Sequence, residues 1–175
     1  MSIESDKANE AALVAAAQGD CLDSFGALYQ RYHNPIVALA YAQLGDRHAA
    51  EDAAQEVFAV ACRDLATLRD RARFGAWLGG ICRNVTRQII RTRNRPAPAP
   101  DEGPAEDSER SEAVRRAVWK LEPGQRELIV MRYFDGFSQA RISEVLDISP
   151  SAVNGRLVRA KRKVAELLKR DGFGS

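Results

Sequence analysis

The chain of 175 residues contains few of the side chains from which most metal and catalytic sites are built. It has two histidines, His33 and His48, and three cysteines, Cys21, Cys62 and Cys82, with no C-x-x-C pair. These spacings exclude the common zinc motifs and offer no Ser-His or Cys-His pairing for nucleophilic catalysis. We therefore expect no catalytic residue, no metal site and no cofactor, and a protein that is not an enzyme by itself. We interpret the cysteines as buried structural thiols and the histidines as surface or structural residues.

Long hydrophobic runs are also missing. The longest candidate, Ile36 to Leu44, stops at Gly45-Asp46 and is too short to cross a bilayer. No signal peptide is recognisable, so we expect a cytoplasmic protein without membrane insertion. No segment alternates between apolar and polar residues as a half-buried strand does, which favours an all-α fold.

Helical periodicity runs through most of the N-terminal half. Apolar residues recur at spacings of three and four along residues 9–21, 22–44, 47–65 and 74–93. A Gly-Asp pair separates the second segment from the third. The third segment turns its alanines to one side, and its opposite face is a polar strip made of Glu51, Asp52, Gln55 and Glu56.

The periodicity stops after residue 93 and returns at about Ser111. Prolines in the intervening stretch remove amide donors and prevent a continuous helix. Residues 94–112 carry a net charge of −4, whereas the blocks 21–93 and 113–175 carry +3 and +6. Two basic blocks around an acidic segment suggest two modules that face a polyanion. We predict two small helical domains joined by a flexible, acidic, Pro-rich linker, with bounds 8–93, 94–111 and 112–170.

A helix-turn-helix pattern follows near the C-terminus, from Phe137 to Lys163. It reads as two short helices whose apolar faces pack together. Ser149 is a suitable N-cap for the second helix and Pro150 a suitable first residue. The outward face of that helix is small and polar at first and then increasingly basic, an order that suits a DNA major groove. Taken alone, this segment also fits an amphipathic hairpin with a solvated basic face.

Several stretches together are similar to bacterial sigma factors of the extracytoplasmic function type, in the sigma-70 family. FGALYQRY, LGDRHAAEDAAQEVFAVA and WLGGICRN resemble domain two of that family, in order and at its usual spacing. LEPGQRELIVMRYFDGFS and ISEVLDISPSAVNGRLVRAKRKV resemble its domain four. The resemblance implies an RNA polymerase sigma factor that binds core polymerase and directs promoter-specific transcription initiation. It also implies an anti-sigma factor as a partner.

The resemblance places the main docking surface for core polymerase on the polar strip of the third segment. Asp52, Gln55 and Glu56 would face the clamp helices of the β′ subunit, and further contacts with the β subunit are implied. A negative, partly amidated helix face suits a basic coiled coil, because complementary charge sets orientation and encounter rate.

The resemblance places the next helix, and the loop before it, against the minus-10 promoter element. Strand separation needs cations for the backbone and a surface that holds an unstacked base. Trp77 shares the apolar period of this helix, so we expect it in the core. Gln88 stands where the family frequently has Asp. The residues implied to contact minus-10 DNA are Arg69, Arg71, Arg73, Arg83, Asn84, Arg87 and Arg91.

The second helix of the helix-turn-helix resembles the reader of the minus-35 element. Arg can pair with guanine or phosphate, Asn with adenine, and a valine can touch a thymine methyl. Asn154-Gly155 replaces a frequent Lys or Arg followed by Ser, and Asp147 replaces a frequent turn Gly, which Asp tolerates in a left-handed conformation. The residues implied to contact minus-35 DNA are Ser151, Asn154, Arg156, Val158 and Arg159.

Other functions remain open at this stage. A helix-turn-helix transcriptional regulator would bind DNA without polymerase, as a dimer on a palindrome. A decoy would keep the polymerase-docking face and bind promoters poorly. The acidic linker would either mimic a polyanion in a basic channel of the polymerase or act as a plain tether.

Overall fold

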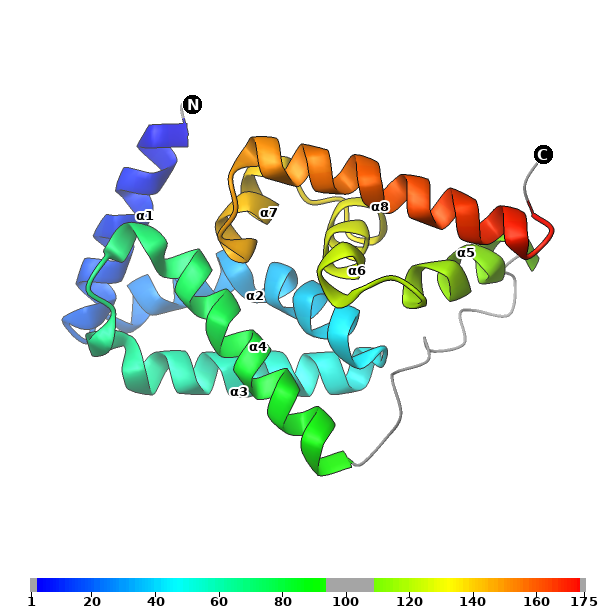
Figure 1. The fold of residues 1–175 in the computed structure, drawn as a ribbon. Helices are drawn as coiled ribbons and strands as arrows, with labels where there is room; N and C mark the ends of the chain where they lie inside the picture. Colours follow the sequence, from blue (N-terminus) through cyan, green and yellow to red (C-terminus); the bar gives the residue numbers. More distant parts are fainter. Residues whose placement is uncertain (1–2, 94–108, 174–175) are drawn as a thin grey trace.

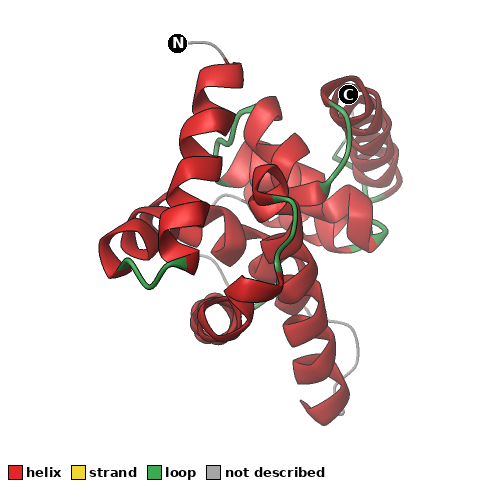
Figure 2. Cartoon of the chain, turned by 90° about the vertical axis from the view of Figure 1, so that its left-hand side faces the viewer, coloured by secondary structure: helices red, strands yellow, loops and turns green. Residues whose placement is uncertain are grey.

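The computed structural model describes residues 3–93 and 109–173. Within these ranges the regular elements are all helical and no strand is present, which confirms the all-α fold. Figure 2 shows helices joined by short loops. Most of the predicted linker lies outside the described residues. Its last three residues already belong to α5 (Glu109–Trp119), so this helix begins two residues before Ser111.

Four long helices form the N-terminal half. Their bounds are α1 (Ile3–Gln18), α2 (Leu22–Leu44), α3 (Arg47–Asp64) and α4 (Phe74–Arg93), and short 3-10 turns η1 (Leu65–Thr67) and η2 (Arg71–Arg73) connect α3 to α4. Helix α1 begins well before the predicted residue 9, because Arg31 of α2 forms an ion pair with Asp6 at 2.6 Å and holds the first turns. The apolar periodicity of residues 9–21 could not predict this longer helix, because the contact joins two segments that are distant in the sequence.

Helix α2 is the centre of the fold. Every residue from Pro35 to Ala42 is buried. Helix α2 is packed by α1, α3 and α4 and by the C-terminal segments α6 (Pro123–Ile129), η3 (Val130–Phe134) and α7 (Gln139–Leu146). The predicted break after it is confirmed. Gly45 ends α2 in the left-handed conformation and donates its N–H to the carbonyl of Tyr41. Asp46 then caps α3 by accepting a hydrogen bond from the N–H of Ala49.

The C-terminal half places four helical segments beneath and along one long helix. Helix α6 (Pro123–Ile129) continues directly into one π-helical turn, η3 (Val130–Phe134). Helices α7 (Gln139–Leu146) and α8 (Pro150–Arg170) form the predicted helix-turn-helix. In Figure 1, α8 runs along the top, with α7 near its first turns and α5 near its end. Pro123 is the first residue of α6, where its missing N–H is not needed for the helix.

The turn between α7 and α8 has the predicted chemistry. Asp147 lies in the left-handed conformation at φ 56° and ends α7. Ser149 accepts a hydrogen bond from the N–H of Ala152, and Pro150 is the first residue of α8. The buried residues of α7 and the first half of α8 face each other as expected, namely Ile142, Val145, Leu146, Val153, Leu157 and Ala160.

The two halves are packed together, which the sequence did not predict. Helix α7 lies against α4, and both α6 and η3 lie against α2. The buried apolar side chains of the two halves therefore form one continuous core cluster.

Candidate polymerase and promoter surfaces

The polar strip of α3 is fully presented to solvent. Asp52, Gln55 and Glu56 are exposed, while the opposite face of the helix is buried against α2 and α4. Glu51, the fourth residue of the strip, lies 3.3 Å from Nε2 of His33. Because the buried face fixes the helix, the strip is a rigid surface with two acidic side chains and one amide among the predicted residues.

The loop before α4 is held by a residue that sequence reasoning missed. Gln18, at the end of α1, donates Nε2 hydrogen bonds to the carbonyls of Leu65 and Leu68 at 3.0 and 2.9 Å. Its Oε1 accepts from Nε of Arg71 at 2.8 Å. Asp70 caps η2 by accepting from the N–H of Ala72. The loop that carries the first three predicted minus-10 arginines is therefore fastened to α1.

The predicted minus-10 residues divide into two groups. Asn84, Arg87 and Arg91 of α4 are exposed, as are Arg69 and Arg71 of the loop. Arg73 is also exposed, but both it and Arg83 contact acids of the C-terminal half of the chain. Arg83 is half-buried and donates to Oε2 of Glu127 at 3.0 Å, and Arg73 forms an ion pair with Asp147. The structure thus does not bring all seven residues to one open surface.

Trp77 agrees with its predicted place in the core. It is half-buried, and its ring lies 5.9 Å from that of Phe74, which is fully buried. Gln88, the departure from the family pattern, lies on the exposed side of α4. The exposed residues of α4 are polar or basic except Ile90, which is 39% exposed, and none of them is aromatic.

The reading face of α8 is presented as predicted. Ser151, Asn154, Arg156, Val158 and Arg159 are all exposed. Val158, the one apolar residue of this set, is 60% exposed.

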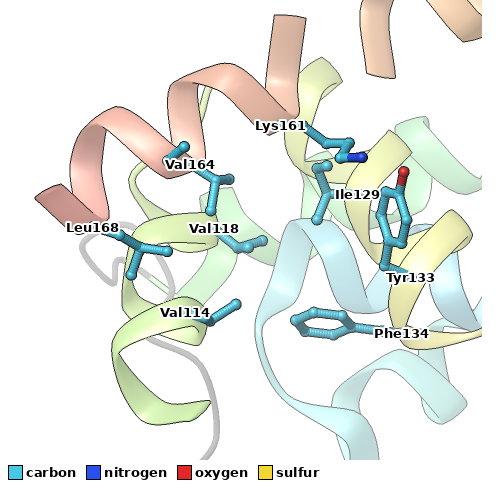
Figure 3. A pocket seen from close by; sticks show the side chains of 9 residues that line it. Val114, Val118, Ile129, Tyr133, Phe134, Lys161, Val164 and Leu168 are labelled. Carbon is cyan, nitrogen blue, oxygen red and sulfur yellow. The ribbon is translucent and has the colours of Figure 1, made fainter. Parts of the chain in front are cut away.

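An apolar groove on the C-terminal half was not predicted from the sequence. It has a volume of about 260 Å³ and lies where α5, η3 and the second half of α8 meet. Figure 3 shows the side chains of Val114, Val118 and Leu168 on one side and those of Tyr133 and Phe134 on the other. Nζ of Lys161 lies 5.6 Å from the ring centre of Tyr133, which is half exposed.

The expectation of three buried thiols is wrong for two of them. Only Cys82 is buried, and burial raises the pKa of its thiol to about 12. Cys21 and Cys62 are exposed. A hydrogen bond from the Ser24 hydroxyl to Sγ lowers the pKa of Cys21 below its usual value. Cys21 lies just before α2 and Cys62 lies within α3, so all three cysteines lie in or beside helical apolar patterns, and periodicity does not separate the two exposed thiols from Cys82.

Neither a metal centre nor a membrane span is found in the part of the chain that the structure describes. No group of histidine, cysteine and carboxylate side chains there could hold a metal ion. No helix there is both long and apolar enough to cross a bilayer.

Comparison with known proteins matches both halves to one family. Residues 28–96 match the family description "Sigma-70 region 2" and residues 111–164 match "Sigma-70, region 4". The chain is 32% identical to the "ECF RNA polymerase sigma factor BldN" of Streptomyces coelicolor, over 96% of this chain and 69% of that protein. The chain belongs to the extracytoplasmic function sigma factors. It is therefore a sigma factor that directs transcription initiation by RNA polymerase.

Two further similarities extend over most of the sigma factor. It is 29% identical to the sigma factor SigW of Bacillus subtilis, over 84% of this chain and 90% of that protein. Among solved structures it is similar to CnrH in complex with the cytosolic domain of CnrY, with a TM-score of 0.64 and 30% identity, over 93% of this chain and 98% of that one. From here on, region 2 denotes α1 to α4 of this sigma factor and region 4 denotes α5 to α8.

Proposed function

We propose that the sigma factor docks on core RNA polymerase through the polar strip of α3. Asp52, Gln55 and Glu56 would contact the clamp helices of the β′ subunit. The proposal is supported by their joint exposure on one rigid helix face inside the stretch that matches sigma-70 region 2. Carboxylates on an exposed face attract a basic coiled coil and orient it during encounter.

We propose that region 2 contacts the minus-10 element through α4 and the loop before it. Arg69, Arg71, Arg87 and Arg91 are exposed and would neutralise phosphates, while Asn84 can bond a base edge. The loop is the part best placed to take up an unstacked base, because Gln18 fastens it and so limits the entropy lost on binding. Arg73 and Arg83 would join this surface only after leaving their partners in region 4.

We propose that α8 reads the minus-35 element from the major groove. Its N-terminal residues Ser151 and Asn154 would reach base edges, and Arg156 and Arg159 would contact guanine or phosphate. Val158 would contact a thymine methyl. The single observation that best supports this arrangement is that all five predicted residues are exposed on the helix that follows a capped helix-turn-helix turn.

Two protein partners complete the proposal. The β subunit of core polymerase would contact region 4, where the groove in Figure 3 offers an apolar surface edged by the exposed rings of Tyr133 and Phe134. An anti-sigma factor would hold the protein inactive. A sigma factor of the same fold, RpoE of Bartonella quintana, was solved in complex with the anti-sigma factor NepR, at 21% identity and a TM-score of 0.58.

The working units of this proposal are residues 8–93 for core binding and the minus-10 element, the linker 94–111, and 112–170 for the minus-35 element. We further propose that the protein performs no catalysis of its own and acts in the cytoplasm, where RNA polymerase works.

Binding of the full chain to core polymerase tests the docking surface. Asp52→Arg combined with Glu56→Arg should weaken binding at least tenfold, because two attractive contacts become repulsive. A matched control, Asp23→Arg with Glu112→Arg, makes the same change of net charge at exposed residues outside α3 and should bind as the wild type does. Equal affinity for all three proteins would contradict docking through α3. Tight DNA binding without any affinity for polymerase would favour a regulator, and polymerase binding without promoter-specific transcripts would favour a decoy.

A further inference from the structure

Helix α8 contains a glycine that its own fold does not require. Gly155 lies inside a regular helix, where glycine lowers stability relative to alanine. The nearest atom that a Cβ placed on Gly155 would meet is Nη1 of Arg159, at 3.8 Å, which is an ordinary van der Waals distance. By contrast, a Cβ on Gly75 of α4 would lie 2.9 Å from the hydroxyl oxygen of Tyr32. Packing therefore explains Gly75 but not Gly155.

Gly155 differs from the other open glycines in its neighbours. Gly26 of α2 has no atom within 4 Å of its Cβ position either, so open space alone does not mark a functional residue. On a helix surface, the neighbours of a residue are those three and four positions away. Ser151, Val158 and Arg159 are at such positions from Gly155, and all three are exposed members of the predicted reading face. The missing side chain leaves a notch in that face, bounded by Val158 and Arg159 and open toward Ser151.

The notch offers van der Waals contact and no hydrogen bond of its own. Its floor is the backbone of α8, whose N–H and C=O groups are engaged in the helical hydrogen bonds. One wall is Val158, an apolar side chain that is 60% exposed. Base edges in the major groove carry one apolar group, the C5-methyl of thymine, beside hydrogen-bond donors and acceptors. The notch has the size of one missing methyl group, so it suits that partner.

We propose that Gly155 is a specificity-determining residue, because its notch takes up the C5-methyl group of a thymine in the minus-35 element. This inference rests on the proposed function, in which α8 lies in the major groove. The methyl group packs against Val158 and the backbone at residue 155, at carbon to carbon distances of about 3.5–4.0 Å. Arg159 then lies beside the same base pair, where its guanidinium reaches a neighbouring guanine or a phosphate.

Deoxyuridine tests the methyl group directly, because it pairs as thymidine does and lacks only the C5-methyl. The probe is the promoter duplex of the strongest start site in a promoter library, with the thymines of its upstream element replaced by deoxyuridine one at a time. Binding is measured with holoenzyme assembled from core polymerase and the full chain. For the wild type, one replacement should weaken binding about fourfold, the effect of one buried methyl group.

Gly155→Ala fills the notch with a methyl group of its own. It should bind the thymine duplex at least threefold more weakly than the wild type and lose the preference for thymine over deoxyuridine. Gly26→Ala makes the same exchange at an open helical glycine outside the proposed DNA contacts, and it should keep the affinity and the preference of the wild type. The melting temperature of both variants should rise by about 2–4 °C, which excludes misfolding as the cause of weaker binding.

A second variant removes a wall of the notch instead of filling it. Val158→Ala should lower the preference for thymine and leave the affinity for the deoxyuridine duplex at the wild-type value, because only contacts with the methyl group are lost. A Val158→Ala protein with the full preference of the wild type would contradict the placement of the methyl group in the notch.

The outcomes separate the notch from the proposed function. The notch is overturned if no thymine of the element prefers its methyl group, or if Gly155→Ala keeps the wild-type preference. Equal losses of Gly155→Ala on the thymine and deoxyuridine duplexes would overturn the assignment to a methyl group. Asn154→Ala combined with Arg156→Ala tests the proposed function and should weaken binding to both duplexes alike. Unchanged binding of this double variant would reject α8 as the reader of the element, whatever the result for Gly155→Ala.

Discussion

Glu127 and Arg83 form an ion pair whose two members are buried to different extents. Side-chain exposure is 7% for Glu127 and 30% for Arg83, at an N to O distance of 3.0 Å. The pair joins region 4 to region 2 over 44 positions of sequence. Because the Glu127 carboxylate is more deeply buried, loss of its partner leaves a charge with little access to water, whereas the Arg83 guanidinium can still be hydrated.

The two members should therefore respond differently to neutral substitution. Arg83→Gln leaves a buried carboxylate without its cation and should lower the free energy of unfolding by about 2 kcal/mol. Glu127→Gln leaves a guanidinium with access to water and should cost about 1 kcal/mol. Urea unfolding of both variants measures the two losses of unfolding free energy and shows whether Arg83→Gln has the larger one. A larger loss for Glu127→Gln would contradict this expectation.

Gln18 should matter for the loop although it lies outside the stretch that matches sigma-70 region 2. Gln18→Ala removes three hydrogen bonds between α1 and the segment from Leu65 to Arg71. Amide exchange in that segment should accelerate, and stability should fall by about 1–2 kcal/mol, less than three full bonds because water replaces part of them. Gln30→Ala, at an exposed position of α2, is the control. Unchanged exchange in Gln18→Ala would show that α1 does not hold the loop.

The three thiols should differ in reactivity. Cys21 and Cys62 should react with a disulfide reagent in the folded protein, whereas Cys82 should react only after unfolding, because it is buried and burial raises its pKa to about 12. Ser24→Ala removes the hydrogen bond that lowers the pKa of Cys21, so the thiolate fraction and the labelling rate at Cys21 should fall at neutral pH. Three thiols labelled in the folded state would contradict this assignment.

Glu10 should make stability depend on pH. Burial raises the pKa of Glu10, although the hydrogen bond donated by the Tyr32 hydroxyl and the charges of Arg31 and Arg141 favour the ionised form. The charge of Glu144 raises the pKa further. A raised folded-state pKa gives stability that is complete below the unfolded value, about 4.3, and is lost as pH rises through the folded value.

The corresponding experiment uses Glu10→Gln, which cannot titrate. The free energy of unfolding of the wild type, measured relative to Glu10→Gln, should fall as pH rises from about 4 to about 7. Asn9→Ala, at the exposed neighbouring position, should give a flat difference over the same range. A difference that grows with pH would mean that the folded-state pKa of Glu10 is lowered.

Asn154 stands where the family often has a cation, so Asn154→Lys should add a phosphate contact. One further neutralised phosphate steepens the slope of log affinity against log salt by about 0.9 on duplex DNA. The measurement is a salt titration of DNA binding. Lys169→Asn, in the last turn of α8, is the control for the effect of a change in net charge away from the proposed DNA contacts. An unchanged slope would place residue 154 away from the DNA backbone.

Local signals made much of the fold predictable. The cap at Ser149, the left-handed Asp147 and the exposed faces of α3 and α8 each depend on residues within a few positions of one another. The Arg83–Glu127 pair, the clamp from Gln18 and the groove beside Tyr133 join distant segments. Periodicity reports which side of a helix is apolar, but it does not report which other helix covers that side. It therefore could not show that region 4 packs on region 2.

The most direct test of the central claim is transcription in vitro with purified core RNA polymerase and a promoter library. The wild type should produce transcripts from defined start sites that share two upstream elements, and Asp52→Arg with Glu56→Arg should abolish them while Asp23→Arg with Glu112→Arg retains them. Start-site-specific transcripts that survive the α3 substitutions would contradict docking through this strip. No transcripts from the folded wild type with active core enzyme would contradict the function itself.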